Sequence, residues 1–282
     1  FIELAVIAAA QRGISVKVEL FTSGSPSEQE LPKGSRVATL TLGGVGSASA
    51  DPLFVQIVRR HTRKTTYESG RPLPESLVRS WEETAIRFGL RGGVVAGLEG
   101  MDSIRRITRE AYEIESTTPR TWLESARLLR IGPSAIATNP DGISLNSPMV
   151  RALYSLGVFD PMEVPVKGSK SLERVMDRWL PFESGSGFLW LASPNNSRLT
   201  QIAAGRAYVR CHLLATAAGS EMHPLSQALQ EFPEVRGPRE AIHKTLGLAA
   251  LGETLQMLSR VGYATEQRGP SPRRGLASML RT

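Results

Sequence analysis

The sequence predicts an α+β fold, in which helices and strands follow one another without a regular repeat. Alternating apolar and polar residues, or apolar runs bounded by Gly or Pro, predict strands at 14–22, 36–42, 94–98, 187–192 and 255–263. The helical patterns between them are unevenly spaced, which argues against a regular parallel βαβ array. With 282 residues, 41% hydrophobic and 22% charged, the chain has the composition of a globular protein. Its length suits one large domain or two packed halves.

Capping residues and apolar periodicity place the helices. Residues 1–13 form an apolar helix closed by Gly13, with no capping residue before it, so we expect a fragment that lacks its true N-terminus. Asp51 and Pro52 open a helix expected to reach residue 62, and Ser197 caps a long one. The helices expected elsewhere are 74–88, 102–115, 119–130, 147–156, 171–179, 198–218 and 239–246. Loops are expected at 23–34, 43–50 and 221–238, and a turn at Gly92-Gly93.

Composition and missing motifs exclude several classes of protein. The single cysteine, Cys211, rules out an intrachain disulfide framework and a multi-cysteine metal site. No apolar run reaches the roughly 18 residues of a transmembrane helix, so we expect no membrane span. The chain contains no G-x-S-x-G, H-E-x-x-H, Walker or G-x-G-x-x-G motif, which leaves nucleophilic catalysis and metal-dependent hydrolysis without support.

The net charge admits an anionic partner. The formal charge is +7, from 34 basic and 27 acidic residues. The basic residues are scattered and aromatic residues make up only 6%, so no basic stretch carries the aromatic residues that stack on nucleic-acid bases. We therefore expect no nucleic-acid partner. A nucleic-acid-binding or general anion-binding domain stays open as a third interpretation of the charge.

Three segments could carry chemistry. The first is Arg59 to Lys64, whose guanidinium, hydroxyl and ammonium groups suit a phosphate, although cations at a helix C-terminus also explain them. The second is the basic tail 270–276, which contains Arg273 and Arg274 and could equally be a solvated tail. The third is 222–227, where a proline-held loop could aim backbone amides at a planar ligand or could be an ordinary turn. Cys211 and His212 are expected to be buried core residues.

Taken together, the three segments resemble the motifs of nitroreductase-family flavoproteins. Arg60-His61-Thr62-Arg63-Lys64 resembles the Arg-[Arg/His]-Ser-x-[Arg/Lys] signature of that family. Pro224-Leu225-Ser226-Gln227, after the 187–192 strand and the 198–218 helix, resembles its Pro-Ile-Glu-Gly loop. The tail Pro272-Arg273-Arg274-Gly275-Leu276 resembles its phosphate-binding Arg-Arg-Pro-Leu ending.

The resemblance extends to the single-chain, duplicated Acg-type branch of that family. It implies a central, mostly antiparallel sheet flanked by helices, internally duplicated with one degenerate half. Residues 1–50 would be the remnant of the first half and residues 51–282 the FMN-binding half, in a monomer that mimics a nitroreductase dimer. The branch's upstream Asn-x-Gln-Pro-Trp segment is absent, which agrees with the expected fragment.

The resemblance also implies site residues. Arg60 and Thr62 would hold the FMN phosphate and ribityl chain, with His61 nearby, and Lys64 would face the N1/O2 edge of the flavin. Arg273 and Arg274 would complete the phosphate clamp. Pro224, Leu225, Ser226 and Gln227 would line one flavin face, with an amide of Ser226 or Gln227 reaching N5. Gln227 stands where the family has glycine, which bears on access to the flavin.

The implied function is an FMN-dependent oxidoreductase that passes electrons from NAD(P)H to a nitro-aromatic, quinone or similar small-molecule acceptor. No side chain need act as catalytic acid or base, because the flavin carries the chemistry. The alternative is a non-catalytic protein that stores or sequesters FMN. Localisation stays open between cytoplasm and periplasm, since an export signal would precede the sequence at hand.

Overall fold

A four-stranded antiparallel sheet forms the centre of the molecule. The computed structural model describes residues 1–22, 34–266, 269 and 271–280. In spatial order the strands are β3 (Arg91–Val95), β6 (Gly187–Ser193), β8 (Thr254–Gly262) and β7 (Glu221–Pro224). Every neighbouring pair is antiparallel, which confirms the predicted sheet. The inner strands β6 and β8 are the most apolar, because each is covered on both faces.

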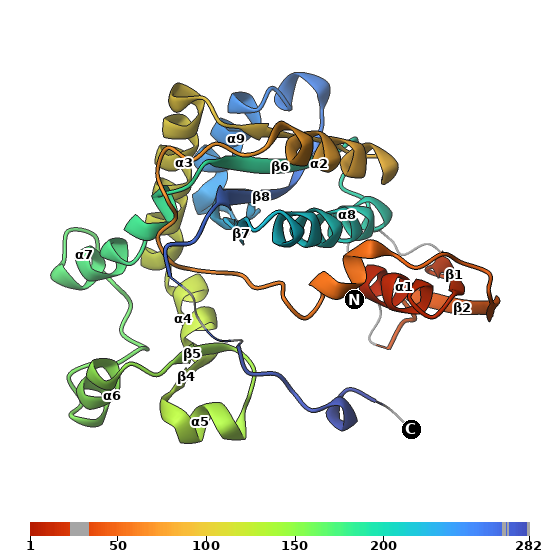
Figure 1. The fold of residues 1–282 in the computed structure, drawn as a ribbon. Coiled ribbons are helices and arrows are strands. Elements are labelled where there is room, and N and C mark those ends of the chain that lie inside the picture. Colours follow the sequence, from red (N-terminus) through yellow and green to blue (C-terminus); the bar gives the residue numbers. More distant parts are fainter. Residues whose placement is uncertain (23–33, 267–268, 270, 281–282) are drawn as a thin grey trace.

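Helices cover the two faces of this sheet (Figure 1). On one face lie α2 (Glu75–Arg87) and α8 (Arg198–Ala217), packed against Leu189 and Leu191 of β6. On the other lie α3 (Leu98–Thr117) and α9 (Arg236–Thr245), packed against Phe188 and Ala192. Successive side chains of a strand point to opposite faces, so one strand contributes to both cores.

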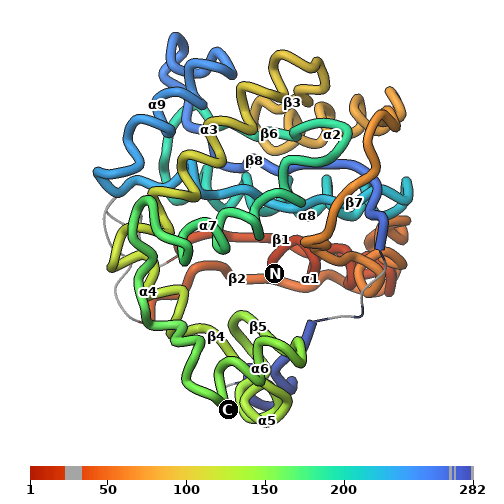
Figure 2. The backbone as a smooth tube through the Cα atoms, turned by 90° about the vertical axis from the view of Figure 1, so that its left-hand side faces the viewer, coloured from red at the N-terminus to blue at the C-terminus, as the bar shows by residue number. Residues whose placement is uncertain are grey.

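Two smaller sheets lie outside the central one. The first pairs β1 (Ile14–Leu20) antiparallel with β2 (Ala38–Val45), and the second pairs β4 (Leu129–Ile131) parallel with β5 (Ile143–Leu145). The remaining α-helices of the described chain are α1 (Ile2–Ala10), α4 (Pro119–Arg127), α5 (Gly132–Thr138), α6 (Pro148–Ser155) and α7 (Lys170–Asp177). Figure 2 shows β4, β5, α5 and α6 at the end of the molecule away from the central sheet, where the C-terminal residues also lie.

Helix α1 is attached to α8 through a buried carboxylate. The Glu3 side chain is only 2% exposed, and its two oxygens accept hydrogen bonds from Arg206 (2.7 Å) and Arg210 (2.5 Å). Arg210 also donates to Asp51 at 2.8 Å. Helix α1 is therefore held to α8 by the ion pairs of Glu3, while β1 and β2 form a separate sheet. The division at residue 50 stays a prediction, and residues 23–33 of the expected 23–34 loop lie outside the described residues.

The helix expected from Asp51 to residue 62 is wrong in extent. Asp51 does cap the start, since its side chain accepts a 3.0 Å hydrogen bond from the Leu53 amide, and Pro52 occupies the first helical position. The chain forms only a 3₁₀ helix over Pro52–Gln56, followed by a turn, and has no regular secondary structure over residues 60–66. Tertiary contacts of this segment hold it in place.

Two further local predictions are wrong. The expected turn at Gly92-Gly93 is part of β3, where a Cβ on Gly92 would lie 2.9 Å from atoms of both Ala85 and Leu191. Glycine is required there by close packing of strand and helix. The expected loop 221–238 begins with strand β7, whose Met222 and His223 are buried. β7 pairs with β8 alone, so it lacks the long apolar pattern of an inner strand.

Candidate functional site

The segment that contains the first predicted motif passes beside the end of the central sheet. Tyr67 forms an isolated antiparallel bridge with Ala264, and the Glu68 amide donates a 2.7 Å hydrogen bond to the Tyr263 carbonyl. Closer to the motif, Arg63 donates a 2.6 Å bond to Glu221 at the start of β7. The structure therefore brings the Arg60–Lys64 segment next to the strand that leads into the Pro224–Gln227 loop.

Arg260, near the C-terminal end of β8, holds this segment through hydrogen bonds to its backbone. Its side chain is fully buried, and its Nη2 donates to the carbonyls of Arg63 (3.3 Å) and Thr65 (2.7 Å). The guanidinium carbon lies 3.8 Å from the centre of the Tyr67 ring. Burial lowers the pKa of Arg260 to about 10, which leaves it charged near neutral pH.

His212 of α8 contacts the same segment from the helix side. Its Nε2 lies 3.0 Å from the His61 carbonyl, and its Nδ1 lies 3.4 Å from Nη1 of Arg60. A carbonyl only accepts, so Nε2 carries the proton and Nδ1 accepts from Arg60. Burial, together with the Arg60 charge, lowers the pKa of His212 to about 4, which keeps the ring neutral. The predicted burial of Cys211 and His212 is confirmed.

His223 connects Arg260 to the loop. Its Nδ1 accepts a 3.1 Å hydrogen bond from Nε of Arg260, and its ring packs edge-on against Phe182. Burial, then the charges of Arg260 and Lys64, hold the pKa of His223 far below its ordinary value. A neutral His223 adds no positive charge of its own beside Arg260. It immediately precedes Pro224, the first residue of the predicted flavin loop.

The Pro224–Gln227 loop leaves the sheet at the end of β7. The last bond to β8 runs from the Leu225 amide to the Leu258 carbonyl at 2.8 Å, and Leu225 is buried. The amides of Ser226 and Gln227 lie beyond this ladder, and the Ser226 side chain is exposed. Oε1 of Gln227 is buried without a hydrogen-bond partner among the described residues.

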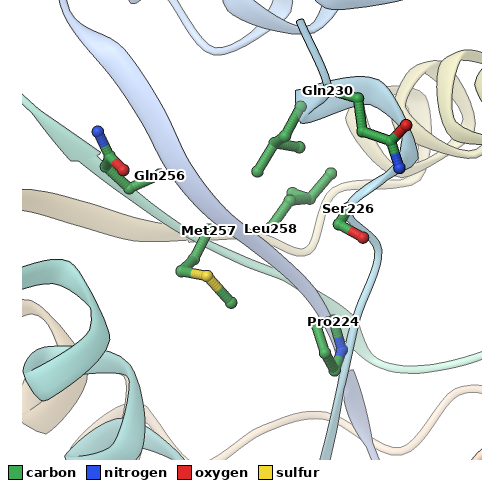
Figure 3. A pocket seen from close by; sticks show the side chains of 7 residues that line it. Pro224, Ser226, Gln230, Gln256, Met257 and Leu258 are labelled. Carbon is green, nitrogen blue, oxygen red and sulfur yellow. The ribbon is translucent and has the colours of Figure 1, made fainter. Parts of the chain in front are cut away.

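A small apolar pocket lies between this loop and β8. Figure 3 shows Pro224 and Ser226 on one side of it, and Met257 and Leu258 on the other. Its volume is about 180 Å³, below the roughly 300–1,000 Å³ of ordinary small-molecule sites. The pocket by itself holds only part of a large planar ligand, and the rest would lie against the neighbouring surface.

The first motif contributes two cations to this part of the molecule. Lys64 is exposed and acts on His223, whereas Arg60 is half-buried against His212 of α8, and Nε of Arg60 is buried without a hydrogen-bond partner within the described chain. Thr62 is exposed beside them. With His212 and His223 neutral, the region presents positive charge and unused donors, which suit an anionic oxygen ligand.

The structure does not bring the tail arginines into this cluster. Arg274 donates to Asp141, which also accepts from Arg130 at 3.2 Å. The Arg274 guanidinium holds the pKa of Asp141 below its ordinary value. Arg273 is exposed and donates to the carbonyls of Ser271 and Pro272. The role of these two arginines in a phosphate clamp stays a prediction.

A larger cavity lies elsewhere, between α1, α2, α8 and the residues around Asp51. Its volume is about 630 Å³, and its wall carries both signs of charge, from Asp51, Glu83, Arg87 and Arg210. None of the predicted flavin-site residues lines it. Over the described ranges, His, Cys, Asp and Glu side chains form no cluster suited to a metal ion, and no helix is long and apolar enough to cross a membrane.

The architecture matches solved structures of FMN-dependent nitroreductases. NfnB of Mycobacterium smegmatis, solved with NADPH, superposes with a TM-score of 0.50 at 18% identity, over 80% of this chain and 96% of that one. The FMN- and NADPH-dependent NfnB of Sphigopyxis sp. strain HMH superposes with a TM-score of 0.50 at 16% identity, over 82% and 99%. The chain has the nitroreductase fold. An FMN-bound nitroreductase of Desulfitobacterium hafniense matches equally well, with a TM-score of 0.50 at 13% identity, over 82% and 98%.

The nitroreductase fold was thus recognisable from three short motifs, although overall sequence similarity is low. No protein-family model matches the sequence, and no curated protein does. Sequence reasoning missed the roles of His223 and Arg260. An arginine inside the apolar stretch 255–263 was the available signal for Arg260, since a charged residue in a buried strand requires partners.

Proposed function

We propose that this protein is an FMN-dependent oxidoreductase that passes electrons from NAD(P)H to a nitro-aromatic, quinone or similar acceptor. The nitroreductase fold supports the proposal, and so do the neighbours described as FMN- and NADPH-dependent. The observation that carries it is the Arg60–Lys64 segment, held by Arg260 and His212 beside the Pro224–Gln227 loop.

The residues present fit the phosphate end of FMN. Arg60 offers a guanidinium whose buried Nε has no hydrogen-bond partner within the described chain, and Thr62 offers an exposed hydroxyl two residues further along. Both sit where His212 and Arg260 fix the backbone, so little side-chain and backbone freedom is lost on binding. We assign the phosphate to Arg60 and Thr62, with His61 contributing through its backbone. Arg273 and Arg274 would join them only in a different conformation of the tail.

Lys64 and the loop fit the ring end of the cofactor. When bound, FMN supplies the redox chemistry, so no side chain of this chain has to transfer a proton. Lys64 places a positive charge beside the ring edge on which negative charge gathers upon reduction. Pro224 and Leu225 give the ring an apolar contact, and the amides of Ser226 and Gln227 are available as donors beyond the end of β7.

One observation favours the alternative, a protein that binds FMN without turnover. Gln227 stands in the loop where glycine would leave the flavin face open, and its side chain is half-buried with an unpaired Oε1. A side chain of this size over the ring would hinder approach of nicotinamide or acceptor. Storage or sequestration of FMN is therefore the second candidate function.

We further propose the duplicated, single-chain organisation, with residues 1–50 as remnant of a first half and a monomer as the working unit. The burial of Glu3 against Arg206 and Arg210 supports this, because α1 covers part of α8 within one chain. Light scattering of the purified protein tests it, with the mass of one chain as the expected result.

Two measurements test the proposed function. The absorbance spectrum of the purified protein after incubation with FMN and gel filtration is expected to show bound flavin in equimolar amount. Oxidation of NADPH with a quinone or nitro-aromatic acceptor is then expected only for the FMN-loaded protein. Bound flavin without NADPH oxidation would select the storage alternative. Absence of flavin together with strong retention on heparin would favour a general anion-binding domain.

A further inference from the structure

We infer that Arg260 is a positioning residue that presents the Arg60–Lys64 segment to the phosphate of the bound cofactor and ties it to the Pro224–Gln227 loop. This inference rests on the proposed function. Arg260 does not reach the ligand in our assignment. It acts through the backbone that it holds and through His223.

All three nitrogens of the Arg260 guanidinium are used. Nη2 donates to the carbonyls of Arg63 and Thr65, and Nε donates to Nδ1 of His223. Nη1 donates to the carbonyl of Pro181 at 2.6 Å and to Oγ of Ser184 at 3.1 Å. The planar fork of an arginine matches such a set of acceptors, and a lysine cannot.

The acceptors come from three parts of the chain. Two carbonyls belong to the first motif and to Thr65 just after it, one carbonyl and one hydroxyl to the 3₁₀ helix and its C-cap before β6, and one ring nitrogen to β7. Ser184 also accepts from the Tyr67 amide at 2.8 Å, and the Tyr67 hydroxyl donates to the Arg63 carbonyl at 3.1 Å. Arg260 is thus the shared centre of the contacts that hold residues 63–67 in place.

The charge of Arg260 has no carboxylate partner among its hydrogen bonds. Its acceptors are carbonyls, a hydroxyl and a neutral imidazole, and its faces lie 3.8 Å from the Tyr67 ring and 5.2 Å from the Phe182 ring. A buried cation solvated only by neutral dipoles adds a positive field beneath the segment that carries Arg60 and Lys64. An apolar residue would fill the same place in a strand whose role was packing alone.

The test compares Arg260→Lys with the unaltered protein and with Ile242→Ala. Lysine keeps the charge and loses the fork. Ile242 is fully buried in α9, and its side chain makes none of the hydrogen bonds that hold residues 60–66, so its truncation destabilises the fold while these hydrogen bonds stay in place. Two quantities are measured: hydrogen exchange of the amides of residues 60–66 without flavin, and the ratio of riboflavin to FMN dissociation constants.

We expect Arg260→Lys to speed exchange in residues 60–66 and to lower the ratio by about tenfold, the effect of losing one ordinary hydrogen bond. Ile242→Ala is expected to leave the ratio unchanged. If Arg260→Lys does not fold, His223→Leu, which removes one acceptor, is expected to change both quantities in the same direction.

Unaltered exchange, or an unaltered ratio in a protein that binds FMN, overturns the inference and leaves the proposed function standing. An equal fall in the ratio for Ile242→Ala also overturns it, because the effect would then be general destabilisation. If the unaltered protein binds neither flavin, the proposed function fails, and the inference fails with it.

Discussion

Nη1 of Arg60 lies 3.4 Å from Nδ1 of His212, which joins the first cation of the motif to the middle of α8. The same ring donates from Nε2 to the His61 carbonyl at 3.0 Å. A single neutral histidine therefore orients both the side chain of Arg60 and the backbone of its neighbour. Nε of Arg60 is buried without a hydrogen-bond partner within the described chain.

Replacement of Arg60 by Ala is expected to weaken FMN binding by roughly 1.5–3 kcal/mol, the range for a hydrogen bond to a charged group. The affinity for riboflavin, which lacks the phosphate, is expected to fall much less. Fluorescence titration with both ligands measures the difference. Arg59→Ala is the matched control, because Arg59 is exposed and adjacent. Equal losses for FMN and riboflavin would refute the phosphate assignment.

Replacement of Arg274 by Ala is expected to change FMN affinity less than replacement of Arg60 does. In the structure Arg274 pairs with Asp141, and Asp141 also pairs with Arg130. Titration with FMN measures both affinities. Asp141→Asn is the companion variant, because it removes the carboxylate that pairs with Arg274. An Arg274→Ala loss as large as that of Arg60→Ala would show that the tail moves to the phosphate.

Replacement of Gln227 by Gly is expected to raise turnover with NADPH and a quinone severalfold while FMN affinity stays within about twofold. The change removes a side chain from the flavin loop and with it a buried, unpaired Oε1, whose burial is costly. Steady-state kinetics of FMN-loaded protein provide the measurement. Gln230→Gly, a glutamine three residues further along that lines the pocket beside β8, is the control. No gain in turnover would show that Gln227 does not block access.

Acid is expected to destabilise the fold through His212. Its pKa is lowered from 6.5 to about 4 in the folded protein, so the unfolded chain binds more protons between these values. Stability is then complete above pH 6.5 and falls as the pH drops towards 4, by about 3 kcal/mol for this group. The lowered pKa of His223 acts in the same direction.

Urea unfolding at several pH values checks this, with His212→Gln as the variant. Glutamine can still donate to the His61 carbonyl but does not titrate. The variant is expected to lose less stability than the unaltered protein between pH 6.5 and pH 4. Parallel curves for the two proteins would contradict the assignment.

Replacement of Glu3 by Gln is expected to cost about 3 kcal/mol of stability, because it leaves Arg206 without its carboxylate and Arg210 with only Asp51 in a buried ion cluster. Glu3 is 2% exposed between Arg206 and Arg210. The control is Glu19→Gln, which breaks an exposed pair with Lys17 and is expected to cost less than about 1 kcal/mol. Chemical denaturation gives both values, and similar costs would mean that α1 is only loosely attached.

Interactions between residues close in sequence determine much of the fold. Ser197 caps α8 as expected, since its hydroxyl accepts from the Thr200 amide at 3.3 Å. The apolar stretches of β6 and β8 form strands of the sheet interior. A strand that is covered on both faces needs no alternation of apolar and polar residues. These features depend on neighbours in sequence, so sequence alone determined them, along with the three motifs that predicted the fold.

Only the tertiary structure decided how the site is assembled. The short strand β7 exists because β8 pairs with it, and residues 61–65 are held in place because His212 and Arg260 bind their carbonyls. Arg260 is 195 residues from Thr65, and His212 is 151 from His61. No local sequence pattern predicts such pairs, because the hydrogen-bond acceptors around a buried cation come from segments that meet only in the folded chain. The position of Arg274 is likewise set by Asp141, far from it in sequence.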